Sequence, residues 1–347
     1  MLKRSFVFAS SALVFALFLL WGGPLESRAE TVKLTYSNFF PPSHAQSKLA
    51  MEWCRRVEKE TEGRVRIDYF PGQTLTKGKV CYDGVVNGLS DVGMSVLGYT
   101  RGRFPIMEVG DLPLGQGGGR VATATVNEVY QKMRPREFSD TQVMYLHAHG
   151  PGLLHTRKKA VRRLEDLKGM KIRCHGSNLK IARALGATPV AKPMPMTYPL
   201  LQKGVVDGSM YPLEANKGWK LAEVIDYATL CYSAAYTTTF FVVMNKDKWA
   251  MISPADQEKI QKVNEEWIEK TGEAWEAADQ EGLRFLKEKK VELVRLDETE
   301  SARWAEAAAP VIDEYVANAR KKGLDGEKAL GFALEAVKKY RKRYGVK

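Results

Sequence analysis

The fold is decided by the stretch that opens with Val32-Lys33-Leu34-Thr35-Tyr36-Ser37 and closes with Asp91-Val92-Gly93-Met94-Ser95-Val96. The opening run alternates apolar and polar residues, which is typical of a β-strand, and the closing run also has a strand pattern. Between them lie a helical pattern that ends at Gly63, a strand pattern at 65–70 and a helical pattern at 80–86. This alternation predicts a mostly parallel sheet with helices on both faces.

A second unit of the same kind begins near Gly150-Pro151-Gly152. The patterns there predict strands and helices in the order strand 170–173, helix 178–185, strand 188–191, helix 198–203 and strand 205–210. A strongly β-prone run at 237–245 follows, and it is long enough to pass between two domains as a hinge.

Ser253-Pro254 begins a long helix, because serine is a good N-cap and proline suits the first helical position. The helical pattern lasts roughly 36 residues, which corresponds to roughly 54 Å. Such a helix is longer than one small domain, so we expect it to brace both lobes. A strand at 291–296 and two more amphipathic helices complete the chain.

The first 29 residues have the layout of a secretory signal peptide. Lys3 and Arg4 precede an apolar segment, and Ser27-Arg28-Ala29 resembles a small-x-small cleavage site. The alternative is an uncleaved membrane anchor, because the apolar segment is near the lower length limit for spanning a bilayer. We expect cleavage before Glu30 and an exported protein.

The chain is basic, with a net charge of +12 over its 347 residues. The predicted signal carries Lys3, Arg4 and Arg28 against Glu26, so its removal leaves +10. Such an excess can steer anionic ligands towards a protein. Basic and acidic residues are mixed along the helices, and an exported protein rarely meets DNA, so we expect no nucleic-acid partner.

Cys54, Cys81, Cys174 and Cys231 are the four cysteines. An oxidising compartment permits disulfides, and four cysteines allow three pairings. A Cys174–Cys231 bridge is one of these pairings and would brace the neighbouring Arg173. Cys54 and Cys81 fall in helical patterns, which also fits buried thiols.

No catalytic constellation stands out. The nearest approach to a serine nucleophile turn, Gly93 to Gly98, has the wrong glycine spacing. The histidines at 147, 149 and 155 offer an alternative, an exported zinc-binding protein or metalloenzyme, although no Asp, Glu or Cys partner has ligand spacing. We expect no enzyme activity and no cofactor.

Arg173 is the strongest candidate binding residue. It ends the apolar run Met170-Lys171-Ile172-Arg173, where a guanidinium presents a planar fork of donors to a carboxylate or sulfonate. Burying its charge without a partner is costly, so an anion should meet it.

The chain resembles the solute-binding proteins of TRAP (tripartite ATP-independent periplasmic) transporters, often typified by dicarboxylate binders. The likeness runs from about Val32 to Leu334 and depends on the order and spacing of several motifs, namely Phe104-Pro105, Asp111-Leu112-Pro113, residues 164–173, residues 185–190, Tyr198, residues 201–208 and Val243-Met244-Asn245-Lys246.

The resemblance implies a periplasmic-binding-protein-like α/β fold with two lobes, hinge strands, a bracing helix and closure over the ligand. We expect lobe I to comprise 30–150 plus about 239–285. Lobe II is expected to comprise 151–238 plus about 286–347. The expected protein is a periplasmic monomer that delivers its ligand to TRAP membrane subunits, or a solute sensor that signals to a receptor.

In the family, the arginine that matches Arg173 pairs with the ligand carboxylate. Further contact positions match Phe39, Tyr99, Leu153, His175, Met194 and Tyr211. Phe40 is added to the expected tail pocket, and His149 and Glu214 are added as polar contacts. Asn is common where Tyr211 stands, and a second Arg can stand where Leu153 stands. The resemblance therefore favours a small monoanion over a long dicarboxylate, and leaves open a hydroxy or keto acid, an aromatic acid or a short sulfonate.

Overall fold

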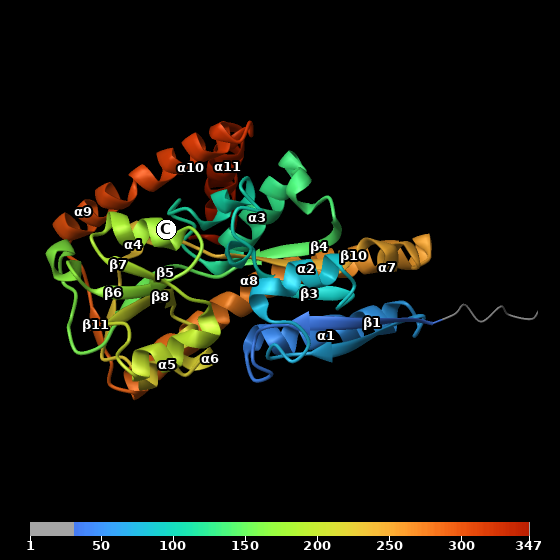
Figure 1. Ribbon diagram of the computed structural model, residues 1–347, viewed down its shortest axis with the longest axis horizontal. Helices are drawn as coiled ribbons and strands as arrows, with labels where there is room; N and C mark the ends of the chain where they lie inside the picture. The colour runs from blue at the N-terminus through green and yellow to red at the C-terminus, as the bar shows by residue number, and fades with distance from the viewer. Residues whose placement is uncertain (1–30, 347) are drawn as a thin grey trace, which may run out of the picture.

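The computed structural model describes residues 31–346, which form two β-sheets that are flanked by helices and lie side by side (Figure 1). The predicted signal peptide lies outside the described residues. The two-lobed α/β architecture expected from the sequence is confirmed.

The first sheet has the strand order β2-β1-β3-β10-β4. Its strands are β1 (Val32–Asn38), β2 (Val65–Phe70), β3 (Val92–Val96), β4 (Thr141–Ala148) and β10 (Thr239–Asn245). β1 lies parallel to β2 and β3, as the opening βαβαβ pattern predicted. β10 runs antiparallel to both of its neighbours.

The second sheet has the strand order β11-β9-β5-β8-β6-β7. Its strands are β5 (Gly152–Thr156), β6 (Lys171–Cys174), β7 (Thr188–Ala191), β8 (Gly208–Pro212), β9 (Tyr227–Thr229) and β11 (Glu292–Val294). β6 is parallel to β7 and β8, whereas β5 is antiparallel to β8 and β9.

In each sheet, the strand that runs antiparallel to its neighbours is the first strand after the chain has crossed from the other sheet. The chain passes from β4 into β5 and returns from β9 into β10. The two crossings contact each other, because Gly152 N donates to Tyr236 O at 2.7 Å. These paired segments are the hinge expected from the run at 237–245.

Helices cover both sheets. They are α1 (Ala45–Glu60), α2 (Cys81–Val86), α3 (Gly119–Met133), α4 (Asn178–Ala184), α5 (Thr197–Gln202), α6 (Ala215–Gly218) and α7 (Lys246–Ala250). In α1 the expected apolar face is buried, with Trp53 and Val57 both inaccessible to solvent. That burial fixes the helix on the first sheet through the hydrophobic effect.

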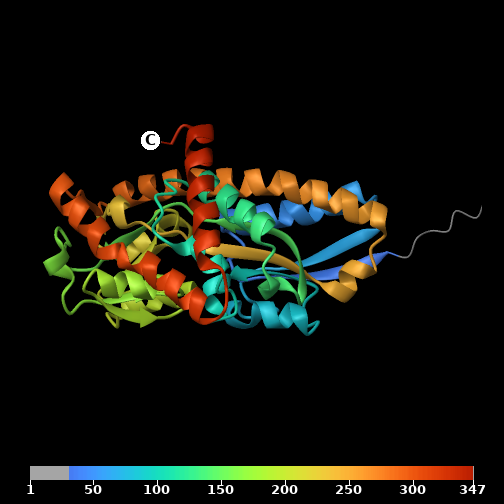
Figure 2. The same ribbon diagram turned by 90° about the horizontal axis from the view of Figure 1, so that it is seen from above.

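The predicted bracing helix is α8 (Pro254–Glu288), which runs along the length of the molecule in Figure 2. The Ser253 side chain accepts a hydrogen bond from Asp256 N, and Pro254 occupies the first position. α8 packs on α1, α3 and β4 of the first lobe and on α6 of the second, so the brace is confirmed.

Three helices follow β11, so the prediction of two was wrong. They are α9 (Glu298–Ala308), α10 (Pro310–Lys321) and α11 (Gly326–Tyr344). Pro310 has no backbone N–H to continue the α9 hydrogen-bond pattern, so a new helix starts there. α11 packs on α3 of the first lobe, although we expected residues 286–347 in the second. The lobe boundaries stay a prediction.

The Cys174–Cys231 bridge is not formed, because all four cysteines are free and buried. Cys174 ends β6 and Cys231 follows β9, with β5 and β8 between them. Strands about 4.8 Å apart place three spacings, roughly 14 Å, between β6 and β9. A disulfide needs Cα atoms within about 7 Å, so the sheet order prevents this pairing.

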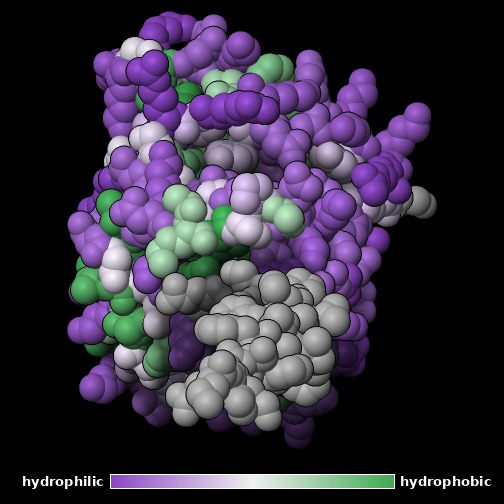
Figure 3. All heavy atoms as spheres, turned by 90° about the vertical axis from the view of Figure 1, so that its right-hand side faces the viewer, coloured by the Kyte–Doolittle hydropathy of each residue, from purple (hydrophilic) through white to green (hydrophobic). Residues whose placement is uncertain are grey.

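Among residues 31–346, no helix combines the length and apolar character needed to cross a membrane. Figure 3 shows one end of the molecule, where hydrophilic residues cover most of the upper part of the face. Charged residues make up 27% of the chain, and a water-facing surface is where they belong.

Candidate ligand-binding site

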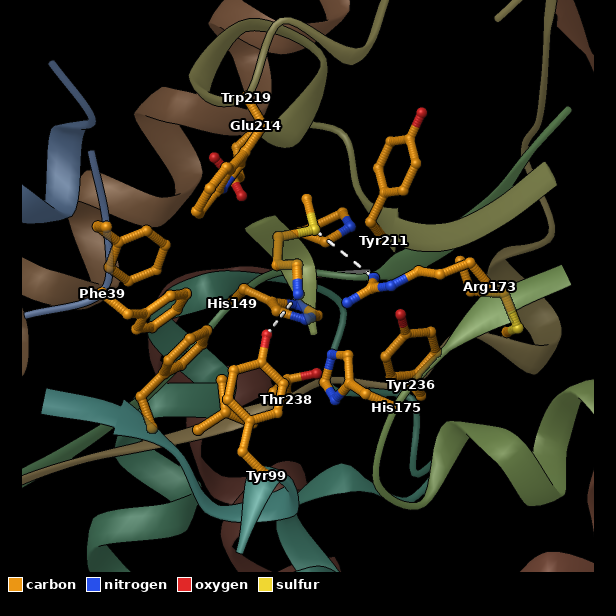
Figure 4. A pocket seen from close by; sticks show the side chains of 16 residues that line it. Phe39, Tyr99, His149, Arg173, His175, Tyr211, Glu214, Trp219, Tyr236 and Thr238 are labelled. Carbon is orange, nitrogen blue, oxygen red and sulfur yellow. Dashed lines mark hydrogen bonds between the residues drawn. The ribbon is translucent and has the colours of Figure 1, made fainter. Parts of the chain in front are cut away.

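A cavity lies between the two lobes, at the ends of β3, β6, β8 and β10 (Figure 4). The space that the centre of a water-sized molecule can reach is only about 30 Å³, so the walls lie close together. The lobes are therefore closed around it. Its wall comprises Phe39, Phe40, Val96, Tyr99, His149, Arg173, His175, Met194, Met210, Tyr211, Pro212, Glu214, Trp219, Tyr236, Thr238 and Phe240.

Arg173 is the cationic residue of this wall, and its side chain is fully buried. Nε donates to Lys192 O at 2.8 Å, and Nη1 contacts Met194 Sδ at 3.5 Å. Nη2 has no hydrogen-bond partner, and no described carboxylate forms an ion pair with this guanidinium. The guanidinium of Arg173 is thus held through Nε, and Nη2 is left free to donate to an anion.

Three further polar side chains near Arg173 have buried atoms without a partner: His175 Nδ1, Tyr236 Oη and Thr238 Oγ1. Figure 4 shows His175 and Tyr236 beside the guanidinium. Burial and the nearby Arg173 charge lower the pKa of His175 well below its usual value, so the ring is neutral. Together these groups provide donors for an anion without a second positive charge.

Tyr99 and Gly98 each contact the other lobe at this site. Tyr99 Oη accepts from Met194 N at 2.8 Å (Figure 4). Gly98 and Gly176 meet through their backbones, so that a Cβ on Gly98 would lie 2.9 Å from Gly176 Cα. Gly176 also has φ +53°, which few side chains tolerate. Both contacts require the lobes to be closed.

Aromatic rings form the left side of the cavity in Figure 4. The ring of Phe39 is nearly parallel to those of Trp219 and Phe240, with centroids 6.1 and 6.3 Å away. Phe40 packs on Phe39 at 4.2 Å. This wall favours a flat apolar ligand body, which can stack on the rings.

Glu214 lies across the cavity from Arg173 and is also buried. Its Oε2 is 2.9 Å from His44 Nε2, which belongs to the other lobe. His149 Nδ1 lies 2.5 Å from Gly150 O, and burial lowers the pKa of His149 to about 4.

Nine of the ten residues singled out from the sequence lie on this wall: Arg173, Tyr99, Phe39, Phe40, Tyr211, His175, Met194, His149 and Glu214. Leu153 does not line the cavity; it is buried in β5, opposite Tyr211 of β8. The Tyr211 hydroxyl donates to Asn216 Oδ1 and its ring stacks on His155, so the cavity meets the ring face.

Sequence reasoning missed seven wall residues: Val96, Met210, Pro212, Trp219, Tyr236, Thr238 and Phe240. Tyr236 and Thr238 belong to the crossing before β10, and Trp219 follows α6. The predicted hinge run at 237–245 was a usable signal for Thr238 and Phe240, because hinge segments border the cleft. Trp219 carried no such signal.

The metal-binding alternative is not supported. Residues 31–346 contain no group of three or more His, Cys, Asp or Glu side chains able to hold a metal ion. His147 Nδ1 accepts from Trp275 Nε1 at 3.0 Å, and His155 Nε2 is 3.2 Å from Asn216 Nδ2. Burial lowers the pKa of each of these two histidines to about 3, which fits uncharged core residues.

Residues 36–319 match the family model for bacterial extracellular solute-binding proteins, family 7. The chain belongs to this family. A C4-dicarboxylate-binding periplasmic protein from Rhodobacter capsulatus is 26% identical over 321 residues, which cover 87% of this chain and 92% of that protein.

Solved TRAP solute-binding proteins have the same fold. One from Bordetella bronchiseptica, with bound mandelate, is 31% identical, with a TM-score of 0.83 over 89% of this chain and 99% of that one. One from Rhodoferax ferrireducens, with copurified benzoate, is 29% identical, with a TM-score of 0.85 over 90% and 100%. The family 7 assignment and the TRAP resemblance therefore agree, and proteins of this family are extracytoplasmic binders of small organic acids that work with TRAP membrane components.

Proposed function

We propose that this protein captures a small organic monocarboxylate, with aromatic acids as the first class to test, and delivers it to TRAP membrane subunits. It would act in the periplasm as a monomer, without catalysis and without a nucleic-acid partner. One observation carries the ligand class: a fully buried arginine with a free donor edge in a cavity walled by aromatic rings.

The number of cationic residues on the wall supports a monoanion. Among the described residues of the wall, Arg173 is the sole Lys or Arg, and the nearby histidines are neutral. A second ligand carboxylate would be buried without a cationic partner, which is costly. The neighbours that hold benzoate and mandelate fit this interpretation.

The proposed binding step is a charge-assisted pair. The ligand carboxylate accepts from the Arg173 Nη2 edge, with Tyr236 Oη and Thr238 Oγ1 as additional donors. Closure removes water, so the attraction is screened less than in solution. The apolar body of the ligand then lies between Phe39 and Tyr211.

Thermal shift tests this proposal with a panel of small carboxylates and sulfonates. A ligand at about 100 times its Kd stabilises the protein by about 2.7 kcal/mol. We expect stabilisation of the wild type by aromatic monocarboxylates and its loss in Arg173→Ala and Arg173→Lys, because lysine cannot form the bidentate pair.

Arg183→Ala, on the exposed face of α4, is the matched control and should keep the full shift. A shift that persists in Arg173→Ala would exclude Arg173 as the anchor. Stabilisation by dicarboxylates or sulfonates alone would exclude the proposed ligand class.

A further inference from the structure

The side of the cavity remote from Arg173 contains a second polar site, formed by Trp219 and Glu214 (Figure 4). Both residues flank the short helix α6, Glu214 immediately before it and Trp219 immediately after it. Both residues line the cavity. The role inferred for this pair rests on the proposed function, because it takes Arg173 as the carboxylate anchor.

Trp219 supplies a donor with nothing to bind. Its Nε1 is buried and has no hydrogen-bond partner. An indole nitrogen can only donate, and a buried donor without a partner costs about 1–3 kcal/mol. The ring itself is held by Phe39 and Phe40, so the N–H cannot turn away to water without losing those contacts.

Glu214 supplies an acceptor. His44 occupies Oε2 at 2.9 Å, and the backbone N of Glu214 donates to Asp279 Oδ1 at 2.9 Å. Oε1 takes part in no hydrogen bond with any described residue. Because His44 comes from the other lobe, this carboxyl group is oriented only when the lobes are closed.

A donor-only atom and an acceptor-only atom on the wall of one cavity select a group that can bind both. A hydroxyl accepts from the indole N–H and donates to the carboxylate. An ammonium satisfies Glu214 alone, and a carbonyl satisfies Trp219 alone. We propose that the ligand carries a hydroxyl at the end remote from its carboxylate, and that Trp219 and Glu214 bind this hydroxyl.

Calorimetric Kd values for matched acids test this inference. The pairs are benzoate with 3- and 4-hydroxybenzoate, phenylacetate with 4-hydroxyphenylacetate, and butyrate with 4-hydroxybutyrate. We expect at least one hydroxylated member to bind about 10-fold tighter or more than its partner, because hydrogen bonds to charged groups have about this effect.

Two variants assign the contact. Trp219→Phe removes the N–H but keeps an aromatic ring against Phe39, and Glu214→Gln removes the charge but keeps the shape. In each variant the ratio of the two Kd values, for the acid without the hydroxyl over the hydroxylated acid, should fall to about threefold or less, whatever the absolute Kd values become. Trp249→Phe, on α7 and away from the cavity, is the matched control.

Mandelate differs from phenylacetate by a hydroxyl next to the carboxylate. The difference in Kd between these two acids should therefore be the same in the wild type and in Trp219→Phe. Equal Kd values within every wild-type pair would overturn this inference and leave the proposed function intact. Failure of every acid to bind would overturn both. A preference for the hydroxylated acid that survives in both Trp219→Phe and Glu214→Gln would overturn the assignment to these residues. The comparison of acids on the wild type decides the ligand class without any variant.

Discussion

Arg173 is the site residue whose environment is most directly predictable from the sequence. Its place at the end of an apolar run predicted a buried cation that needs an anion, and the side chain is indeed buried with a free donor edge. Its helpers Tyr236 and Trp219 were not predictable in this way. They reach the cavity from connecting segments, whose path depends on how the two sheets meet.

Asp111 gives the stability of the protein a specific pH dependence. Its side chain is 1% exposed, Oδ1 accepts from Thr239 N at 2.7 Å, and burial raises the pKa to about 7. The unfolded carboxyl has a pKa of about 3.9. The contribution of Asp111 to stability is therefore fully present below about pH 3.9 and is lost as the pH rises towards 7.

Asp111→Asn removes this titration and keeps the oxygen that accepts from Thr239. We expect the variant to gain roughly 3 kcal/mol relative to the wild type between pH 5 and pH 8, at about 1.4 kcal/mol per pH unit below the folded pKa. Urea unfolding of both proteins at the two pH values measures this difference. A constant difference would show that Asp111 does not titrate in this range.

Gly98 is a residue at which one methyl group should affect binding more than folding. The added Cβ of Gly98→Ala would lie 2.9 Å from Gly176 Cα, across the lobe interface. Closure would stop early, so we expect ligand affinity to fall about 10-fold or more, while the unliganded protein loses less than about 1 kcal/mol. Calorimetry and urea unfolding together separate the two effects. Unchanged affinity would mean that full closure is not required.

At the scale of elements, the helices and strands with a regular hydrophobic pattern were predictable from the sequence, and those without such a pattern were not. α1, α8 and the strands of the first βαβαβ unit follow clear patterns. α3 was missed because its sequence is rich in Thr and Val, which have weak helix propensity, and because it starts at the glycine run 117–119. Packing decides its structure: Gly119 lies so close to Trp275 of α8 that a Cβ would be 2.5 Å away.

The brace formed by α8 depends on close approach to the second lobe at Gly282. A Cβ there would lie 2.0 Å from Leu213 O, so Gly282→Ala must displace the helix or the loop. We expect a loss of about 1–3 kcal/mol in the free energy of unfolding. Thermal and urea unfolding measure it.

Gly331→Ala is the matched control for this prediction. Gly331 lies within α11, where an added Cβ meets nothing within 4 Å. Alanine there should stabilise the protein by up to about 1 kcal/mol, because glycine is a poor helix former. If both variants behave alike, the contact of α8 with Leu213 contributes little.

At the scale of the whole molecule, the excess of basic residues should govern how fast an anion arrives. Lys79, Arg101 and Lys192 line a groove of about 520 Å³ that reaches Tyr99 and His175 of the site wall. None of the three forms an ion pair within residues 31–346. Positive potential in such a groove raises the association rate of an anion and is screened by salt.

Replacing these three residues by alanine should lower the association rate constant of a carboxylate ligand about 3- to 10-fold at low salt. The dissociation rate should stay nearly unchanged, and the difference should disappear near 0.5 M salt. Stopped-flow fluorescence measures both rates. Lys338→Ala with Lys342→Ala and Arg343→Ala removes the same charge from α11 and is the control; an equal effect there would point to net charge instead of the groove.

The contact between Gly98 and Gly176 also sets the angle at which the two lobes come to rest. Backbone atoms meet there, so the end point of the rotation is fixed by the chain and not by the ligand. A molecule slightly too large for the cavity holds the glycines apart and stops the rotation at a wider angle. Molecular size is thereby converted into an orientation of one lobe relative to the other. A membrane subunit that touches both lobes can detect this orientation, so uptake can be more selective than binding.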